Sequence, residues 1–199
     1  ASEAYESGLL GAAARLQSSE SVASAYRAAG APLPDRLELS TAERGMALEV
    51  IYASQNLDGG WSATEGDASS DLSATAWVLV GLERMERAMS AEVLQNTITV
   101  DAQVEMLALD FLQVESARPA PGQVSTAALD ARAYAFYALA LNGALKADLA
   151  RPYVQFAGAS PGSDGLSRAG QAWLALALYY AGDPATAWTL LDRLLLTPE

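Results

Sequence analysis

Three stretches of this 199-residue chain are apolar on all sides and are bounded by residues that interrupt regular structure. They cover residues 74–82, 133–145 and 169–181, and they are rich in Ala and Leu rather than in β-branched residues. A helix that is apolar all round must be covered on every side by protein or by membrane. These stretches are shorter than the roughly 20 residues that span a bilayer. We therefore expect three central, buried helices of a soluble protein.

Amphipathic segments alternate with the apolar ones along the chain. The chain contains 42 Ala and 29 Leu, which favours helices throughout. Alternating outer and inner helices are typical of a two-layer helical toroid or solenoid, and an irregular helical bundle is the alternative. The fold class that we predict is all-α, an α/α toroid, and a partial one. The expected helices cover about 41–55, 72–87, 92–115, 126–143, 149–157, 166–181 and 184–196.

Composition removes several classes of function. The chain has no Cys and no His, which excludes a thiol nucleophile, a Ser-His-Asp triad and a zinc site built from thiolate or imidazole ligands. The net charge of −12 disfavours binding to nucleic acid or to anionic membrane surfaces. We predict no metal and no cofactor, and carboxylates remain as the acid–base groups available near neutral pH.

The sharpest local motif lies at residues 55–61, with the sequence Gln-Asn-Leu-Asp-Gly-Gly-Trp. Gly59 and Gly60 permit positive φ and a tight reversal, and Asp58 is able to accept hydrogen bonds from backbone N–H groups just after it. Trp61 is able to seal the turn against neighbouring helices, and Gln55 to cap backbone groups at a helix end. We expect a structural turn between an outer and an inner helix, and a sugar- or ligand-stacking role for Trp61 is the alternative.

This motif resembles the Q-W repeat of α/α toroid proteins, and the chain is most similar to the bacterial alpha-2-macroglobulin type. The likeness extends over residues 26–30, 51–61, 70–82, 131–135 and 168–182. The resemblance implies the thioester-type domain of a protein that traps proteases after its bait segment is cut. In many members of the family, a Cys-x-Glu-Gln motif in this domain forms a thioester that couples to the protease.

The chain departs from that pattern because it lacks Cys. The segment that falls where the family's thioester would lie has Ser7 in the place of Cys, and Leu9 and Leu10 in the places of Glu and Gln. Natural loss, mutation, or a Cys that lies upstream and was trimmed are open explanations. The resemblance then implies steric trapping without covalent coupling.

Rival functions rest on the acidic loop 58–71, whose carboxylates are Asp58, Glu65, Asp67 and Asp71. Two carboxylates beside Trp61 would suit a toroid glycoside hydrolase. Calcium is a further candidate, although the spacing of an EF-hand is absent. A prenyltransferase would need Cys and His ligands for zinc, and a triterpene cyclase an aspartate-rich acid motif; the chain has neither.

Our prediction is a single helical domain over residues 1–199, a fragment of a larger thioester-type domain, with no enzymatic activity. The expected partners are neighbouring domains of the same large protein and trapped proteases. The expected location is extracellular or periplasmic, and a membrane anchor on the larger parent protein is compatible with it. A toroid carbohydrate-active enzyme and a protein-binding scaffold are the alternatives. An incomplete toroid would expose an apolar edge, so we also expect the piece to self-associate.

Overall fold

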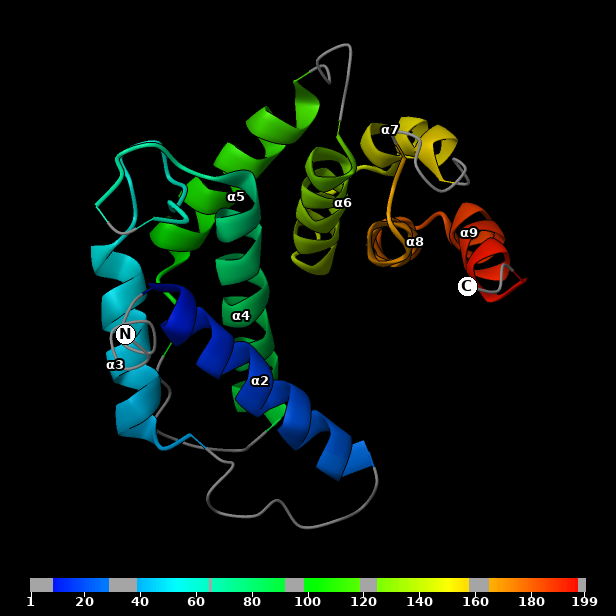
Figure 1. Ribbon diagram of the computed structural model, residues 1–199. Helices are drawn as coiled ribbons and strands as arrows, with labels where there is room; N and C mark the ends of the chain where they lie inside the picture. Colours follow the sequence, from blue (N-terminus) through cyan, green and yellow to red (C-terminus); the bar gives the residue numbers. More distant parts are fainter. Residues whose placement is uncertain are drawn as a thin grey trace. The chain divides into compact units, whose positions relative to one another are not determined.

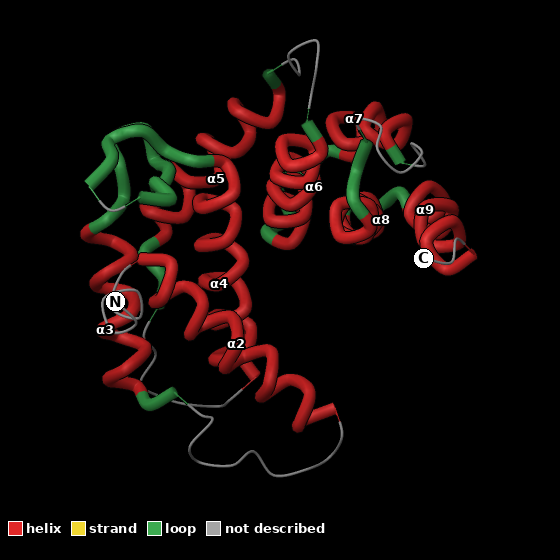
Figure 2. The backbone as a smooth tube through the Cα atoms, viewed as in Figure 1, coloured by secondary structure: helices red, strands yellow, loops and turns green. Residues whose placement is uncertain are grey.

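The computed structural model describes residues 9–28, 39–64, 66–91, 99–118, 125–157 and 165–196 (Figure 1). All regular structure in these ranges is helical, with turns and loops between the helices (Figure 2). The prediction of an all-α chain is therefore confirmed. The helices are α2 (Leu9–Ala28), α3 (Thr41–Ala53), α4 (Leu72–Ala91), α5 (Ala102–Ala117), α6 (Thr126–Leu141), α7 (Ala147–Ala150), the 3-10 helix η2 (Arg151–Phe156), α8 (Arg168–Tyr180) and α9 (Pro184–Leu196).

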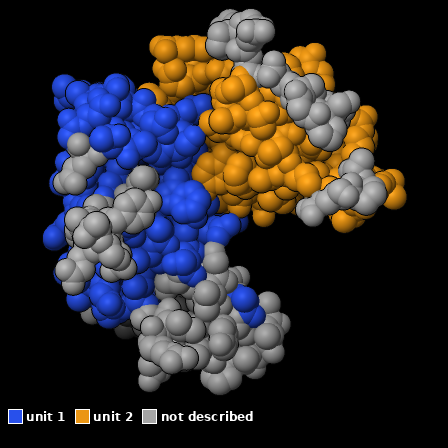
Figure 3. All heavy atoms as spheres, in the orientation of Figure 1, with its two compact units in different colours: residues 1–108 blue, residues 109–199 orange. Residues whose placement is uncertain are grey.

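The chain divides into two compact units, residues 1–108 and 109–199 (Figure 3). The boundary falls within α5, whose first seven residues belong to unit 1. Each unit is described by itself, and the single domain expected from the sequence stays a prediction. Among the described helices, none is both long and apolar enough to cross a membrane.

Unit 1 is built around α4, against which α2 packs closely. The two helices approach at Gly81, where an added Cβ would lie 3.2 Å from the carbonyl oxygen of Ala13. Gln17, a buried residue of α2, donates from Nε2 to the carbonyl oxygen of Trp77 at 2.8 Å. The helix α2 is absent from our expected set because its small and Ser-rich sequence has no clear apolar stripe. Tertiary contact with α4 provides the burial that the helix needs.

Helix α3 begins at the residue expected from the sequence because its N-terminus is capped. Ser40 and Glu43 form a reciprocal capping box, in which Ser40 N donates to Glu43 Oε2 at 2.8 Å and Glu43 N donates to Ser40 Oγ at 3.3 Å. These bonds satisfy N–H groups that a helix N-terminus otherwise leaves without partners.

Helix α5 corrects our expected helix over 92–115. It begins at Ala102, and Asp101 accepts a hydrogen bond from Gln103 N at 2.8 Å as its N-cap. The β-branched run 97–100 precedes this cap and has low helix propensity. The apolar positions Leu94 and Ile98 that suggested the longer helix lie outside the described residues.

In unit 2, α8 packs against α6 and against α9. Every residue of α6 from Ala133 to Leu141 is buried, as expected for a central helix. The same expectation is wrong for α8, because Leu176, Tyr179 and Tyr180 are 38%, 52% and 47% exposed. The lack of charge in a helix sequence predicts burial. How many sides of the helix are covered depends on the tertiary packing.

The helix expected over 149–157 is a single α-turn followed by a 3-10 helix. Pro152 lies at the start of that 3-10 helix. Since Pro has no N–H group, it cannot make the i→i−4 hydrogen bond of an α-helix, and the chain continues with the tighter i→i−3 pattern.

Candidate functional site: the turn at residues 55–61

The predicted motif forms a closed turn that follows α3. Asn56 N donates to Gly60 O at 2.9 Å, and Gly59 N donates to Asn56 O at 2.9 Å. These two hydrogen bonds pair backbone groups of the turn with one another. The remaining contacts tie it to three helices of unit 1.

The two glycines serve different purposes. Gly59 has a φ of +89°, and a Cβ there would lie 2.7 Å from the carbonyl carbon of Leu107 in α5. Gly60 does not have positive φ, contrary to the expectation that both glycines would supply it. At Gly60 a Cβ would lie 2.5 Å from Ser70 Cβ and 2.9 Å from Thr75 Oγ1. Gly59 is therefore needed for conformation and close packing, and Gly60 for close packing alone.

Asp58 stabilises the reversal through local hydrogen bonds, as its position predicts. Its Oδ1 accepts from Gly60 N at 3.1 Å and also from the hydroxyl of Ser70. Asn56 Nδ2 donates to Ser70 Oγ at 3.1 Å. Ser70 thereby joins the two ends of the acidic loop.

Trp61 is the anchor of the turn and is fully buried, with 0% of its surface exposed. Its indole Nε1 donates to Ile51 O in α3 at 2.8 Å, and its backbone N donates to Thr75 Oγ1 in α4 at 2.9 Å. An indole with no exposed face offers no platform for a sugar ring. The stacking alternative therefore has no support from the position of this side chain.

Gln55 reaches a different partner from the one expected. We expected it to cap a helix end, whereas its Nε2 donates to Gly59 O and to Val104 O, each at 2.9 Å. Val104 lies in the first turns of α5. One amide group thus closes the turn and links it to a helix 49 residues away.

In the acidic loop that carries the enzyme and calcium alternatives, the described carboxylates are each engaged in local hydrogen bonds. Asp71 caps α4 by accepting from Ala74 N at 2.8 Å. Asp67 accepts from Ser69 N at 3.0 Å, and hydrogen bonds from Ser69 hold the pKa of Asp67 below its ordinary value. Glu65 lies outside the described residues. Among described residues, no group of three acidic side chains is arranged to hold a metal ion.

A separate set of carboxylates lies on α4 and α5, and the sequence reading did not single it out. Burial raises the pKa of Glu86 and of Glu105, and the nearby charge of Glu83 raises both further. Glu86 also accepts a hydrogen bond from Val100 N, and the hydroxyl of Tyr52 accepts from Asp101 N at 2.9 Å. The backbone N–H groups of the two residues before α5 are therefore hydrogen-bonded to side chains of α4 and α3.

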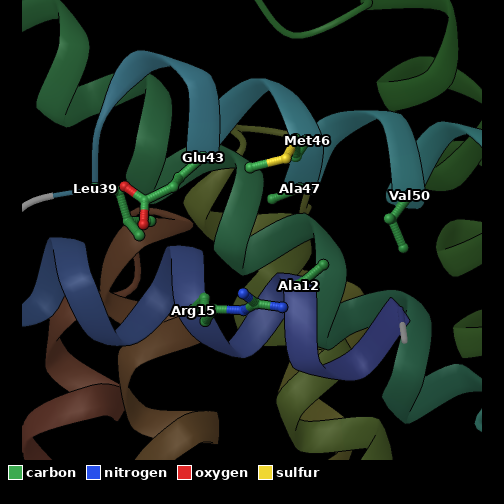
Figure 4. A pocket seen from close by; sticks show the side chains of 7 residues that line it. All are labelled: Ala12, Arg15, Leu39, Glu43, Met46, Ala47 and Val50. Carbon is green, nitrogen blue, oxygen red and sulfur yellow. The ribbon is translucent and has the colours of Figure 1, made fainter. Parts of the chain in front are cut away.

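A pocket of about 210 Å³ lies between α2 and α3 (Figure 4). Ala12 and Arg15 of α2 face Met46, Ala47 and Val50 of α3 across it. The volume is below the 300–1,000 Å³ typical of small-molecule sites. Its carboxylate, on Glu43, is already engaged in the α3 cap. We assign no ligand to this pocket.

The segment that stands in the place of a thioester is described only in part. Ser7 lies outside the described residues, and Leu9 and Leu10 form the start of α2. Their assignment as a degenerate thioester segment stays a prediction.

Sequence reasoning missed Thr75 and Ser70, which complete the hydrogen bonding of the turn. Thr75 Oγ1 accepts from Trp61 N and donates to Asp71 O at 2.8 Å. A buried Thr within an otherwise apolar stretch was the available signal, because a buried hydroxyl needs partners. Nothing in the sequence identifies Trp61 as that partner.

Among known proteins, the chain matches solved structures. Neither a protein-family model nor a curated protein sequence matches the chain. Native alpha-2-macroglobulin from Escherichia coli, solved from domain MG7 to the C-terminus, superimposes with a TM-score of 0.66 at 18% identity over 96% of this chain. The match covers 29% of that chain.

Two further structures agree with this result. Trypsin-activated alpha-2-macroglobulin from Escherichia coli gives a TM-score of 0.67 at 16% identity, covering 95% of this chain and 12% of that one. Salmonella alpha-2-macroglobulin reacted with methylamine gives 0.66 at 16% identity, covering 96% and 12%. This chain thus spans less than a third of each of these proteins. The likeness confirms the predicted fold class: the chain has the all-α, α/α toroid-type fold of a region of bacterial alpha-2-macroglobulins.

Proposed function

We propose that the chain is a non-catalytic, thioester-type domain, without a thioester, of a bacterial alpha-2-macroglobulin-like inhibitor that traps proteases. The observation that carries the proposal is the fold likeness, which extends over 96% of the chain at a TM-score of 0.66. The buried Q-W turn supports it, because the residues of the resemblance form the joint between helices that such a domain needs.

The proposal specifies steric trapping. A thioester requires a Cys thiol, and this chain contains no Cys. A protease held by this protein would therefore be enclosed without a covalent bond to this domain. The role left for the domain is mechanical: it packs against neighbouring domains of the same protein and moves when the bait is cut.

Several features support a role without enzymatic catalysis. The carboxylates Asp58 and Asp71 are engaged in the turn and in a helix cap. Trp61, the side chain that would bind a sugar in the rival hypothesis, is buried. An inhibitor of this type acts outside the inner membrane, so we propose a periplasmic or extracellular location with proteases as targets.

The test uses the whole protein that carries this chain, mixed with trypsin. Residual activity is measured on a small chromogenic peptide and on a large protein substrate. We expect hydrolysis of the peptide to continue and hydrolysis of the protein to fall, since a cage admits only small substrates. The trypsin should run free on a denaturing gel, and pretreatment with methylamine should change nothing.

Each readout has an outcome that contradicts the proposal. Equal activity on both substrates would remove the inhibitor hypothesis and leave a scaffold. Equal loss on both would indicate a direct block of the trypsin active site. A trypsin adduct that survives denaturation would show that covalent coupling occurs despite the absence of Cys from this chain.

A further inference from the structure

The first turns of α5 are attached to the rest of unit 1 mainly by polar contacts. None of the residues 101–107 is buried, whereas Val100 before them and Ala108 after them are. The described partners of this segment belong to α3, α4 and the turn that follows α3, all within unit 1. An element that buries few apolar side chains opens at a low cost in free energy. A small change in free energy is therefore able to alter the attachment of this segment.

Two hydrogen bonds attach the segment at its start. Val100 N donates to the carboxylate of Glu86 in α4, and Asp101 N donates to the hydroxyl of Tyr52 in α3 at 2.9 Å. Both bonds require that the start of α5 stays beside α3 and α4. The bond to Glu86 also couples the attachment to a group that takes up and releases a proton.

Three carboxylates gather where α4 faces this segment. Glu83 and Glu86 lie one turn apart on the same side of α4, and Glu105 lies in the first turns of α5. All three are partly buried, and the charges of Glu83 and Glu86 both act on Glu105. Like charges repel more strongly where water is partly excluded. Since the repulsion acts between α4 and α5, it favours separation of the two helices.

The other titratable groups that act on these carboxylates, among the described residues, leave the repulsion in place. Arg87 is a cation on α4, and it pairs with Glu83 one turn earlier. Tyr52 faces Glu86 from α3, and burial raises the pKa of the Tyr52 hydroxyl, which therefore stays neutral at pH 7. Asp101, beside that hydroxyl, adds a further negative charge. The charge between Glu86 and Glu105 is therefore not offset.

Protonation relieves this repulsion, and it does so at Glu105. Burial is the main cause that raises the pKa of Glu86 and of Glu105, and the neighbouring carboxylates raise both further. The hydrogen bond from Val100 N acts in the opposite direction at Glu86, because it favours the charged form. The two carboxyl groups titrate as a coupled pair, and the proton that the pair retains lies chiefly on Glu105.

We propose that the first seven residues of α5 form a pH-sensitive switch, which is docked on α4 in mild acid and loosened as the pH rises. A proton on Glu105 removes the repulsion and leaves the bond between Val100 and Glu86 intact. Loss of that proton puts a second charge beside Glu86 and favours the state in which the start of α5 has separated from α4. The opening is local, because α2 and α4 keep their own packing. This switch does not depend on the inhibitor function.

Hydrogen exchange of the 199-residue chain, followed by mass spectrometry at pH 5 and pH 7, tests the switch. Protection factors are corrected for the intrinsic exchange rate at each pH. We expect the protection of residues 105–108 to fall roughly threefold or more between pH 5 and pH 7, because the docked state loses the proton that stabilises it. Amides of α2 and of α6 should keep their protection.

Three variants identify the groups involved. Glu105→Gln removes the titrating group and should keep residues 105–108 equally protected at both pH values. Asp110→Asn is the matched control, since it removes an exposed carboxylate from the same helix; it should retain the wild-type fall. Tyr52→Phe removes the hydroxyl that binds Asp101 N, so it should lower the protection at both pH values and preserve the fall between them. Circular dichroism checks that each variant folds.

Three results would overturn the proposal. The first is equal protection of residues 105–108 at both pH values in the wild type. The second is a fall in Glu105→Gln as large as that of the wild type, because the proton would then not lie on Glu105. The third is a parallel fall in α2 and α4, which would mean that the whole of unit 1 opens rather than the start of α5.

Discussion

The indole N–H of Trp61 donates a hydrogen bond to the carbonyl oxygen of Ile51, ten residues earlier, at 2.8 Å. Ile51 lies in the last turn of α3, where its carbonyl oxygen also accepts a hydrogen bond from the C-cap Ser54 N at 3.2 Å. One side chain therefore adds a hydrogen bond at the end of a helix and also fills the space between helices, with 0% of its surface exposed. The stability of unit 1 should depend on it.

Trp61→Ala should lower the free energy of unfolding by about 3–5 kcal/mol, the cost of truncating a large buried aromatic side chain. Trp61→Phe is the control, because it keeps much of the buried area but removes the indole hydrogen bond to Ile51 O, which keeps its bond from Ser54 N; we expect a loss of roughly 0.5–1.5 kcal/mol. Urea unfolding followed by circular dichroism measures both. A loss under about 1 kcal/mol for the Ala variant would show that the indole is exposed, and would revive a ligand role.

Gly59→Ala should destabilise more than Gly66→Ala. Both glycines have positive φ, +89° and +79°, so both substitutions carry the backbone penalty of roughly 1–2 kcal/mol. Only Gly59 also faces α5, where the new Cβ meets the Leu107 carbonyl group, whereas Gly66 faces open space. The difference in unfolding free energy between the two variants measures the contact of the turn with α5. Equal losses would contradict this close contact.

Glu105→Gln should raise the melting temperature at pH 7 by a few degrees. Burial, together with the charges of Glu86 and Glu83, raises the pKa of Glu105, so between the unfolded and the folded pKa the folded chain binds a proton that the unfolded chain has released. The stability from this group is present below the unfolded pKa and is lost as the pH rises through the folded pKa. Acidification from pH 7 toward 5 should therefore stabilise the wild type more than the variant.

The control for this pH prediction is Glu49→Gln, which alters an exposed carboxylate of α3. Its melting temperature should follow that of the wild type across the pH range. Glu43, Asp67 and Asp183 have lowered pKa values, so their contributions to folding stability are lost only at more acidic pH. This loss is the same in the wild type and in both variants. A Glu105→Gln melting profile parallel to that of the wild type would contradict the proposed burial of charge.

Ser116→Ala should leave the stability unchanged or raise it by up to about 1 kcal/mol. The Ser116 hydroxyl in α5 is buried and has no hydrogen-bond partner among the residues that the structure describes, so its removal leaves none of their groups unpaired. Ser125→Ala is the contrasting variant, since Ser125 caps α6 by accepting from Ala128 N; it should cost about 1 kcal/mol. Thermal and urea unfolding compare the two. Destabilisation by Ser116→Ala would indicate a partner for that hydroxyl.

Several helix starts were predictable because a local cap marks them. The starts of α3, α6 and α9 lie at the expected residues because Ser40, Ser125 and the pair Asp183-Pro184 cap or initiate helices through contacts within one turn. The start of α5 was missed because its cap, Asp101, lies within an apolar pattern that continues upstream. The helix α2 was missed because its burial comes from contact with α4.

The sequence by itself determined the all-α class, the loops between helices and the Gln55–Trp61 turn, because periodicity, caps and glycine conformation depend on residues within a few positions. It also excluded thiol, imidazole and thioester chemistry in this chain, because no Cys or His is present. Only the tertiary structure decided that Gln55 bonds to Val104 and Trp61 to Thr75, that Gly60 is needed for space rather than for φ, and that α8 keeps one face open. Those features depend on which distant segments pack together, and a packing choice is a property of the whole chain rather than of any local stretch.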